Sequence, residues 1–71
     1  MVGMKAFCER MKELRVEHHL TQKELAERLN TSNSSVCDWE KGRSQPDLQT
    51  LANMAQLFDV STDYLLGLSD S

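Results

Sequence analysis

The chain has 71 residues, two of them cysteines, and a net charge of −3 at pH 7. Its 39% hydrophobic and 27% charged residues are typical of one small folded domain, so we expect a single domain over residues 1–71. No apolar run approaches the roughly 20 residues of a membrane span, and the N-terminal segment lacks the apolar stretch of a signal peptide, which predicts a cytoplasmic protein with no membrane association.

Apolar residues recur at helical spacing from the start of the chain, and no segment alternates as a strand would. The first helix is predicted over about residues 4–18. Its apolar face consists of Phe7, Met11 and Leu14. Leu20 follows as a buried connector, and Thr21 then begins the pattern T-Q-K-E. This pattern predicts a capping box, in which Thr21 and Glu24 satisfy each other's backbone N–H groups at the start of a second helix over about 22–29.

A tight turn separates the second predicted helix from a third. The second helix carries Leu25, Ala26 and Leu29 on one face. The segment Asn30-Thr31-Ser32 ends this helix, because asparagine tolerates the left-handed conformation of a tight turn. Ser32 is the predicted N-cap of the third helix, which extends over 33–41 and ends at Gly42. The inward residues of the third helix are Val36 and Trp39.

Two more helices complete the prediction. Asp47 caps a fourth helix and Ser61 caps a short fifth one. The fourth helix is expected to point Leu48, Leu51, Met54, Ala55 and Phe58 inward. The fifth carries Tyr64, Leu65 and Leu66. Five short helices with short connections predict a compact all-α domain.

No arrangement in the sequence indicates an enzyme, a metal centre or a cofactor site. Cys8, Cys37 and the adjacent pair His18 and His19 do not have the close spacing of metal ligands. The chain has no glycine-rich phosphate loop, no paired-carboxylate cleft and no Ser-His-Asp arrangement. We expect no catalysis, no metal, no cofactor and no small-molecule ligand, because so small a domain also lacks room for a pocket of roughly 300 Å³ or more.

The second and third helices meet the demands of a helix-turn-helix. A small residue is needed where the two helices nearly touch, and Ala26 supplies it. A residue that tolerates positive φ is needed at the turn, and Asn30 supplies it. Such a pair of helices can place its second member in the major groove of DNA.

Four segments together resemble a known family. They are LTQxELA from Leu20, SxxSVxxWExG from Ser32, PxLxxLA from Pro46 and VSxDYLL from Val60. Their joint spacing is closely similar to that of the lambda-repressor-like, or XRE, family of transcriptional regulators. The resemblance covers about residues 7–67, with the motif at about 21–41. It implies a five-helix lambda-repressor-like domain whose partner is double-stranded DNA.

The face of the third helix opposite Val36 and Trp39 is polar and is the predicted base-reading surface. The predicted base-contacting residues are Asn33, Ser34, Cys37 and Asp38. Asparagine can bond bidentately to adenine, serine can bond either base type, and a carboxylate can accept from the cytosine amino group. Cys37 is interpreted as a small contact to a thymine methyl. As an alternative, oxidation of its thiol would block docking.

Contacts to the DNA backbone are expected at both ends of the motif. The predicted residues are Gln22, Lys23, Lys41, Arg43 and Ser44. Gln22 lies where free N–H groups at a helix start favour an anion, and the resemblance implies a phosphate contact there. The net charge of the chain counts against non-specific binding, and residues 21–46 carry four acids and four bases. We therefore expect affinity to depend on dimerisation and on helix N-termini.

An ion pair between Arg15 and Glu40 is predicted from spacing. Arg15 follows Met11 by four residues, and Glu40 follows Val36 by four, so each lies at the edge of an apolar face. A half-buried charge needs a partner, and the family has a pair at the matching positions. The pair would tie the first helix to the third.

The predicted function is a homodimeric repressor on a two-fold operator, with half-sites about 34 Å apart. The predicted dimer interface is Tyr64, Leu65 and Leu68. As an alternative, Tyr64 and Leu65 only close the core. Because the sequence ends just after the fifth helix, we expect no sensing domain and control by concentration or by a partner. The competing hypothesis is a protein-interaction module on the same fold, such as an antitoxin or anti-repressor, which the acidic balance and Asp38 favour.

Overall fold

Five helices make up the part of the chain that the computed structural model describes, residues 4–70. They are α1 (Met4–Glu17), α2 (Gln22–Arg28), α3 (Asn33–Lys41), α4 (Leu48–Phe58) and α5 (Thr62–Leu65). Residues 4–70 contain no strand, so the predicted all-α class is confirmed; α1 and α2 each end one residue earlier than predicted. None of the helices in this span is long and apolar enough to cross a membrane. The predicted domain span also includes residues 1–3 and 71, which lie outside the described residues.

The starts of the last four helices follow one capping rule. The N-caps are the predicted Thr21, Ser32, Asp47 and Ser61. In each case the side-chain oxygen accepts a hydrogen bond from the backbone N–H three residues further on. These bonds satisfy N–H groups that would otherwise lack a partner in the first helical turn, so the sequence sets where each helix begins.

The helix ends also follow one pattern. A residue with positive φ comes just after each helix: His19, Asn30, Gly42, Asp59 and Gly67, with φ between 56° and 77°. The N–H of the next residue then donates back to a carbonyl five residues earlier, as Leu20 does to Arg15 and Arg43 to Asp38. This is the Schellman type of helix end, which normally favours glycine. Three of the five ends use His, Asn or Asp instead, and these side chains bear the strain of the left-handed conformation.

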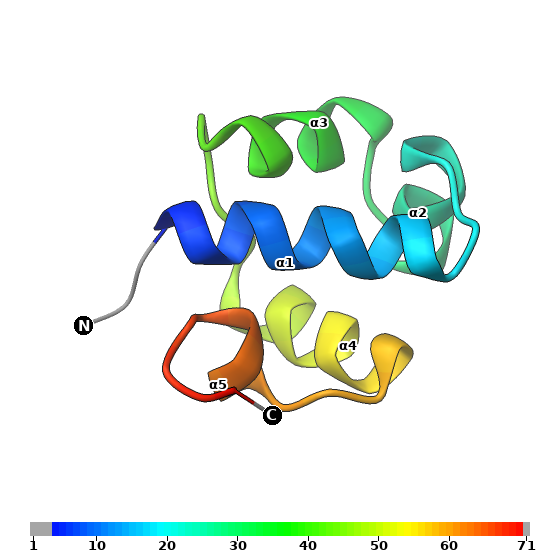
Figure 1. The fold of residues 1–71 in the computed structure, drawn as a ribbon. Helices are drawn as coiled ribbons and strands as arrows, with labels where there is room; N and C mark the ends of the chain where they lie inside the picture. The colour runs from blue at the N-terminus through cyan, green and yellow to red at the C-terminus, as the bar shows by residue number, and fades with distance from the viewer. Residues whose placement is uncertain (1–3, 71) are drawn as a thin grey trace.

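Helix α1 lies between the other elements, with α2 and α3 on one side and α4 and α5 on the other (Figure 1). The buried core consists of Phe7, Met11, Leu14, Leu25, Ala26, Leu29, Val36, Trp39, Met54, Ala55, Phe58 and Leu65. All five helices or their immediate ends contribute to it. Because one cluster of side chains joins both sides of α1, helices α2 and α3 are held on a scaffold made by the whole domain.

The inward prediction for Leu48 is wrong. Its side chain is 84% exposed, although Met54, Ala55 and Phe58 further along α4 are buried. Leu48 occupies the first position of α4, directly after the cap at Asp47, where the helix extends past the core. The apolar spacing of α4 is therefore correct, but its first turn lies beyond the layer of side chains that could cover it. Leu20, Leu51, Tyr64 and Leu66 are only partly buried at the edge of the core.

Candidate nucleic-acid interface

Helices α2 and α3 pack against each other across the four-residue connection 29–32. Ala26 is buried, and Asn30 has φ 57°, as the turn requires. The N–H of Thr31 donates to the carbonyl of Ala26 at 2.9 Å and closes the turn. The predicted helix-turn-helix is therefore present, with the small residue and the left-handed residue where its geometry needs them.

The outer face of α3 presents the four predicted base-contacting residues. Asn33 and Ser34 are exposed in its first turn, and Cys37 and Asp38 are half-buried one turn later. Val36 and Trp39 are buried on the opposite side of the same helix. Because the buried pair fixes the rotation of α3 against the core, the polar face points away from the domain.

Three of the predicted backbone-contacting residues lie at the end of α3 or directly after it. Lys41, Arg43 and Ser44 are all exposed. The left-handed Gly42, with φ 77°, turns the chain here. Arg43 Nη1 lies 3.9 Å from Asp38 Oδ1, and the two side chains are 68% and 42% exposed. At this exposure the ion pair adds little stability, so Arg43 can exchange its partner for another anion.

Gln22 and Lys23 stand at the start of α2, the other edge of the surface. The capping box at Thr21 and Glu24 is present in both directions: the Thr21 hydroxyl accepts from the Glu24 N–H at 3.0 Å, and the Glu24 carboxylate accepts from the Thr21 N–H at 2.9 Å. The hydrogen bond from the Thr21 backbone lowers the pKa of Glu24. These bonds use the backbone N–H groups of Thr21 and Glu24. An anion at this helix start would therefore be bound by the side chains of Gln22 and Lys23.

Arg15 and Glu40 form an ion pair where α1, α2 and α3 meet. Arg15 Nε lies 2.6 Å from Glu40 Oε2, and the two side chains are only 13% and 5% exposed. Arg15 Nη1 also donates to the Leu20 carbonyl at 2.8 Å. Gln22 Nε2 donates to the second carboxylate oxygen, Glu40 Oε1, at 3.1 Å. The spacing argument identified the pair but not the amide of Gln22, whose position depends on how α2 packs.

This pair changes the charge balance of the motif. The sequence count treats Glu40 as one of four acids against four bases in residues 21–46. In the structure the Glu40 carboxylate is buried and is compensated by Arg15, which lies outside the motif. The solvent-facing part of the motif is therefore more positive by one charge than the count of residues indicates.

Cys8 and His18 make contacts within the fold. Cys8 Sγ donates to the Trp39 carbonyl at 3.1 Å, which links α1 to α3, and Cys37 is a free thiol. The His18 ring packs against Phe58 with its centroid 4.9 Å away. Within residues 4–70 no three His, Cys, Asp or Glu side chains are close enough together to hold a metal ion.

The prediction of Leu65 as a dimer contact is wrong. Leu65 is fully buried, because the single turn of α5 directs it into the core, as the core-closing alternative proposed. Tyr64 is half-buried, with the Arg10 guanidinium 4.3 Å from its ring centroid. Arg10 also donates to the carbonyls of Tyr64 and Ser69. Leu68 remains 49% exposed.

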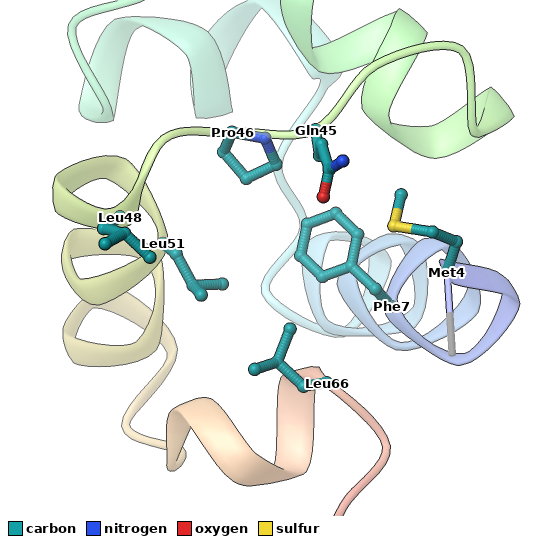
Figure 2. Close-up of a pocket in the computed structure, with 7 residues that line it drawn as sticks. All are labelled: Met4, Phe7, Gln45, Pro46, Leu48, Leu51 and Leu66. Carbon is teal, nitrogen blue, oxygen red and sulfur yellow. The ribbon is translucent and has the colours of Figure 1, made fainter. Parts of the chain in front are cut away.

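Sequence reasoning missed an apolar hollow between α1, α4 and α5. The hollow has a volume of about 160 Å³ and is lined by Met4, Phe7, Gln45, Pro46, Leu48, Leu51 and Leu66 (Figure 2). Phe7 and Leu66 come from opposite sides of it, and the exposed Leu48 stands at its rim. No short motif encodes this feature, since its lining is drawn from four separate segments of the chain.

Comparison with known proteins places the chain in a family. The helix-turn-helix family model matches residues 11–65, which include the complete motif and most of the core. The chain belongs to this family of XRE-type transcriptional regulators.

Two relatives of the chain carry the names of transcriptional regulators. It is 42% identical to the HTH-type transcriptional regulator YobD of Bacillus subtilis over 90% of this chain and 57% of YobD. It is 47% identical to the HTH-type transcriptional regulator ImmR of the same organism, over 82% of this chain and 46% of ImmR. The chain thus spans about half the length of these curated relatives. In structure it is similar to the P22 c2 repressor in complex with a synthetic operator, with a TM-score of 0.83, 25% identity, and coverage of 89% of this chain and 96% of the repressor chain.

Proposed function

We propose that the chain binds double-stranded DNA sequence-specifically, with α3 in the major groove, and that it acts as a repressor on a two-fold operator. The observation that carries the proposal is the exposed pair Asn33 and Ser34 at the start of α3, on a helix whose other face is locked into the core by Val36 and Trp39. The N-terminal end of a recognition helix is the part that contacts base edges.

Each side chain of the polar face suggests a base. Asn33 suits adenine, with which an amide can form two hydrogen bonds, and Ser34 can bond either base type. The half-buried Cys37 offers a small apolar contact to a thymine methyl. Asp38 can only accept hydrogen bonds, so it selects cytosine, whose amino group donates in the major groove. Its ion partner Arg43 is then free to contact a phosphate.

Backbone contacts complete the proposed interface. The proposed residues are Gln22, Lys23, Lys41, Arg43 and Ser44. They flank α3 on both edges of the motif, and all but the half-buried Gln22 are exposed. Such contacts set the register of α3 in the groove without reading sequence.

A two-fold operator requires two copies of the domain, with half-sites about 34 Å apart. The apolar surface offered to a second copy consists of Leu48 and Leu66, which line the hollow between α1, α4 and α5, together with the half-buried Tyr64 and the exposed Leu68 near the end of α5. The repressor role is supported by the likeness to the P22 c2 repressor, which was solved on an operator. A domain that occupies a promoter can block polymerase without further parts.

The experiment that tests this proposal is a selection of binding sites from random duplex DNA with purified protein at low salt. We expect enrichment of a palindromic consensus. Asn33→Ala and Ser34→Ala should each relax the preference at one position per half-site, and each lost base contact should cost about 1–3 kcal/mol. Lys41→Ala is the matched control, since loss of a phosphate contact weakens binding to all sequences and lowers the salt dependence. No enrichment by a folded protein would refute the proposal.

A second candidate function is a protein-interaction module. The outer face of α1 favours it, because Glu9, Glu13 and Glu17 lie one turn apart beside Val16, which is 56% exposed, and Lys12 balances only one of the three acids. This surface suits a basic partner with an apolar contact, such as a toxin or another repressor. Failure of the DNA selection together with capture of a partner that Glu13→Lys abolishes would establish this function instead.

A further inference from the structure

The Glu40 carboxylate is the point at which three helices meet. One of its oxygens, Oε2, accepts from Arg15 Nε of α1 at 2.6 Å. The other, Oε1, accepts from Gln22 Nε2 of α2 at 3.1 Å and from Arg15 Nη2 at 3.3 Å. With a side chain only 5% exposed, Glu40 has little contact with water, so its geometry is determined by these two partners.

The contact with Glu40 determines how the Gln22 amide is turned. A side-chain amide can rotate to exchange its oxygen and its NH₂ group, and the two orientations offer opposite hydrogen-bonding groups to a neighbour. A carboxylate can only accept hydrogen bonds, so Gln22 must direct its NH₂ group at Glu40. One N–H of the Gln22 amide then donates to Glu40, and this bond fixes the amide in the donor orientation. The second N–H of the same NH₂ group is held beside the first.

The charge of Glu40 would by itself oppose an anion near Gln22. Arg15 removes this difficulty, because two of its nitrogens lie within 3.3 Å of the carboxylate and neutralise it locally. The third nitrogen, Nη1, donates to the Leu20 carbonyl just before α2 and so holds the entry to that helix.

We propose that Glu40 is a positioning residue for DNA binding, which holds the Gln22 amide with its NH₂ group ready to donate to a backbone phosphate while Arg15 cancels the carboxylate charge. The inference rests on the proposed function and adds to it a residue that does not touch DNA. Orientation before binding matters because the interface then loses less conformational entropy when the contact forms.

The test is a double-mutant cycle on DNA affinity with Glu40→Gln and Gln22→Ala, measured on the duplex recovered by the selection. Glu40→Gln removes a negative charge near phosphates, so simple electrostatics predicts tighter binding. Positioning predicts the opposite, because a glutamine at position 40 has a single acceptor oxygen for two donors. We expect about tenfold weaker binding in the Gln22 background and less than about twofold in the Gln22→Ala background, a coupling typical of residues in contact.

A stability control separates positioning from folding. All affinities are measured at a temperature at which each variant is fully folded, and Met54→Val serves as a variant destabilised in the core of α4, away from the interface. We expect Met54→Val to bind as the wild type does. Tighter or unchanged binding of Glu40→Gln, or an equal loss in both Gln22 backgrounds, would overturn the inference. If no duplex is recovered, the proposed function itself fails.

A measurement on the free wild-type protein covers the case in which Glu40→Gln does not fold. The side-chain NH₂ protons of Gln22 are observed by NMR, with the exposed Gln56 as the internal reference. We expect one Gln22 proton to exchange with solvent at least about tenfold more slowly than those of Gln56, because it is donated to a buried carboxylate. Equal exchange for both glutamines would show that the amide is free and would overturn the inference.

Discussion

The two sides of α1 are held together by different kinds of interaction. Toward α2 and α3 the contact includes directional polar bonds, with Arg15 and Cys8 of α1 reaching Glu40 and the Trp39 carbonyl. Toward α4 and α5 the Arg10 guanidinium donates to the Tyr64 and Ser69 carbonyls, and beside these bonds lies an apolar hollow of about 160 Å³, with an exposed Leu48 at its rim (Figure 2). Directional bonds fix a helix in one orientation, whereas apolar contacts tolerate repacking. Both sides contain directional bonds, but those toward α2 and α3 centre on the buried Glu40 carboxylate, so that side is the more strictly specified of the two.

The largest effect on stability is expected when the ion pair of Arg15 and Glu40 is broken. Arg15→Met should destabilise the domain by about 3–5 kcal/mol, because it leaves the buried Glu40 carboxylate without its counter-charge. Urea unfolding of the two proteins would measure the difference. The double variant Arg15→Met with Glu40→Leu is the control, and it should recover most of the loss, since an apolar pair can replace a buried ion pair. A loss below about 1 kcal/mol in the single variant would place the pair among ordinary surface pairs.

A slightly smaller effect is expected on the apolar side. Leu65→Ala should cost about 2–5 kcal/mol, because the leucine is fully buried and its removal leaves a cavity. Leu68→Ala, at a residue that is 49% exposed, should change stability by no more than about 0.5 kcal/mol. Thermal unfolding of the pair checks the assignment. Similar losses at both positions would mean that Leu68 also belongs to the core.

The comparison of sequence with structure shows a similar division. Local signals were read correctly: all four predicted N-caps form, and Asn30 takes the left-handed turn. The predicted ion pair of Arg15 and Glu40 is present, since spacing placed both at the edge of an apolar face. These features depend on a few neighbouring residues or on helical periodicity alone, which a sequence displays directly.

The errors occur where the position of a whole helix matters. Leu48 and Leu65 both fit the apolar period, yet one is exposed and the other fully buried. Which of them is covered depends on how far α4 extends past α1 and on how α5 turns back toward the core. Helical periodicity predicts neither of these two features. The contacts of Arg10 with Tyr64 and Ser69 were not predicted. Arg10 follows Phe7 by three residues and precedes Leu14 by four, so it lies at the edge of the apolar face, as Arg15 does.

A pH-dependent effect of smaller size is expected at the start of α2. The pKa of Glu24 is lowered from its ordinary value of 4.5 by the hydrogen bond from the Thr21 backbone. The carboxylate therefore contributes stability above pH 4.5, and this contribution is lost as the pH falls through the lowered pKa of the folded state. Glu24→Gln should have a lower Tm than the wild type at pH 7, and the difference should narrow as the pH falls below 4.5. A difference that is constant over this range would assign the effect to shape rather than to charge.

The smallest effect on stability is expected at Leu48, where the apolar side meets solvent. Leu48→Ser should change the free energy of unfolding by no more than about 0.5 kcal/mol, since the side chain is 84% exposed. If a second copy docks around the hollow, the same substitution should shift sedimentation from dimer toward monomer on operator DNA. Val16→Ser is the matched control, because Val16 is also an exposed apolar residue, but on the outer face of α1.

The variants Leu48→Ser and Val16→Ser test where a second copy docks, which a measurement of stability does not show. An exposed leucine beside an unfilled apolar hollow costs the free domain solvation energy, and that cost is recovered only when the surface is covered. Loss of assembly in Leu48→Ser but not in Val16→Ser would locate the covering copy at the hollow. Loss in Val16→Ser alone would move the contact to the outer face of α1. The hollow would then be only a gap in the packing of the scaffold. Two copies of the domain would have to assemble through α1 in order to present both α3 helices to DNA.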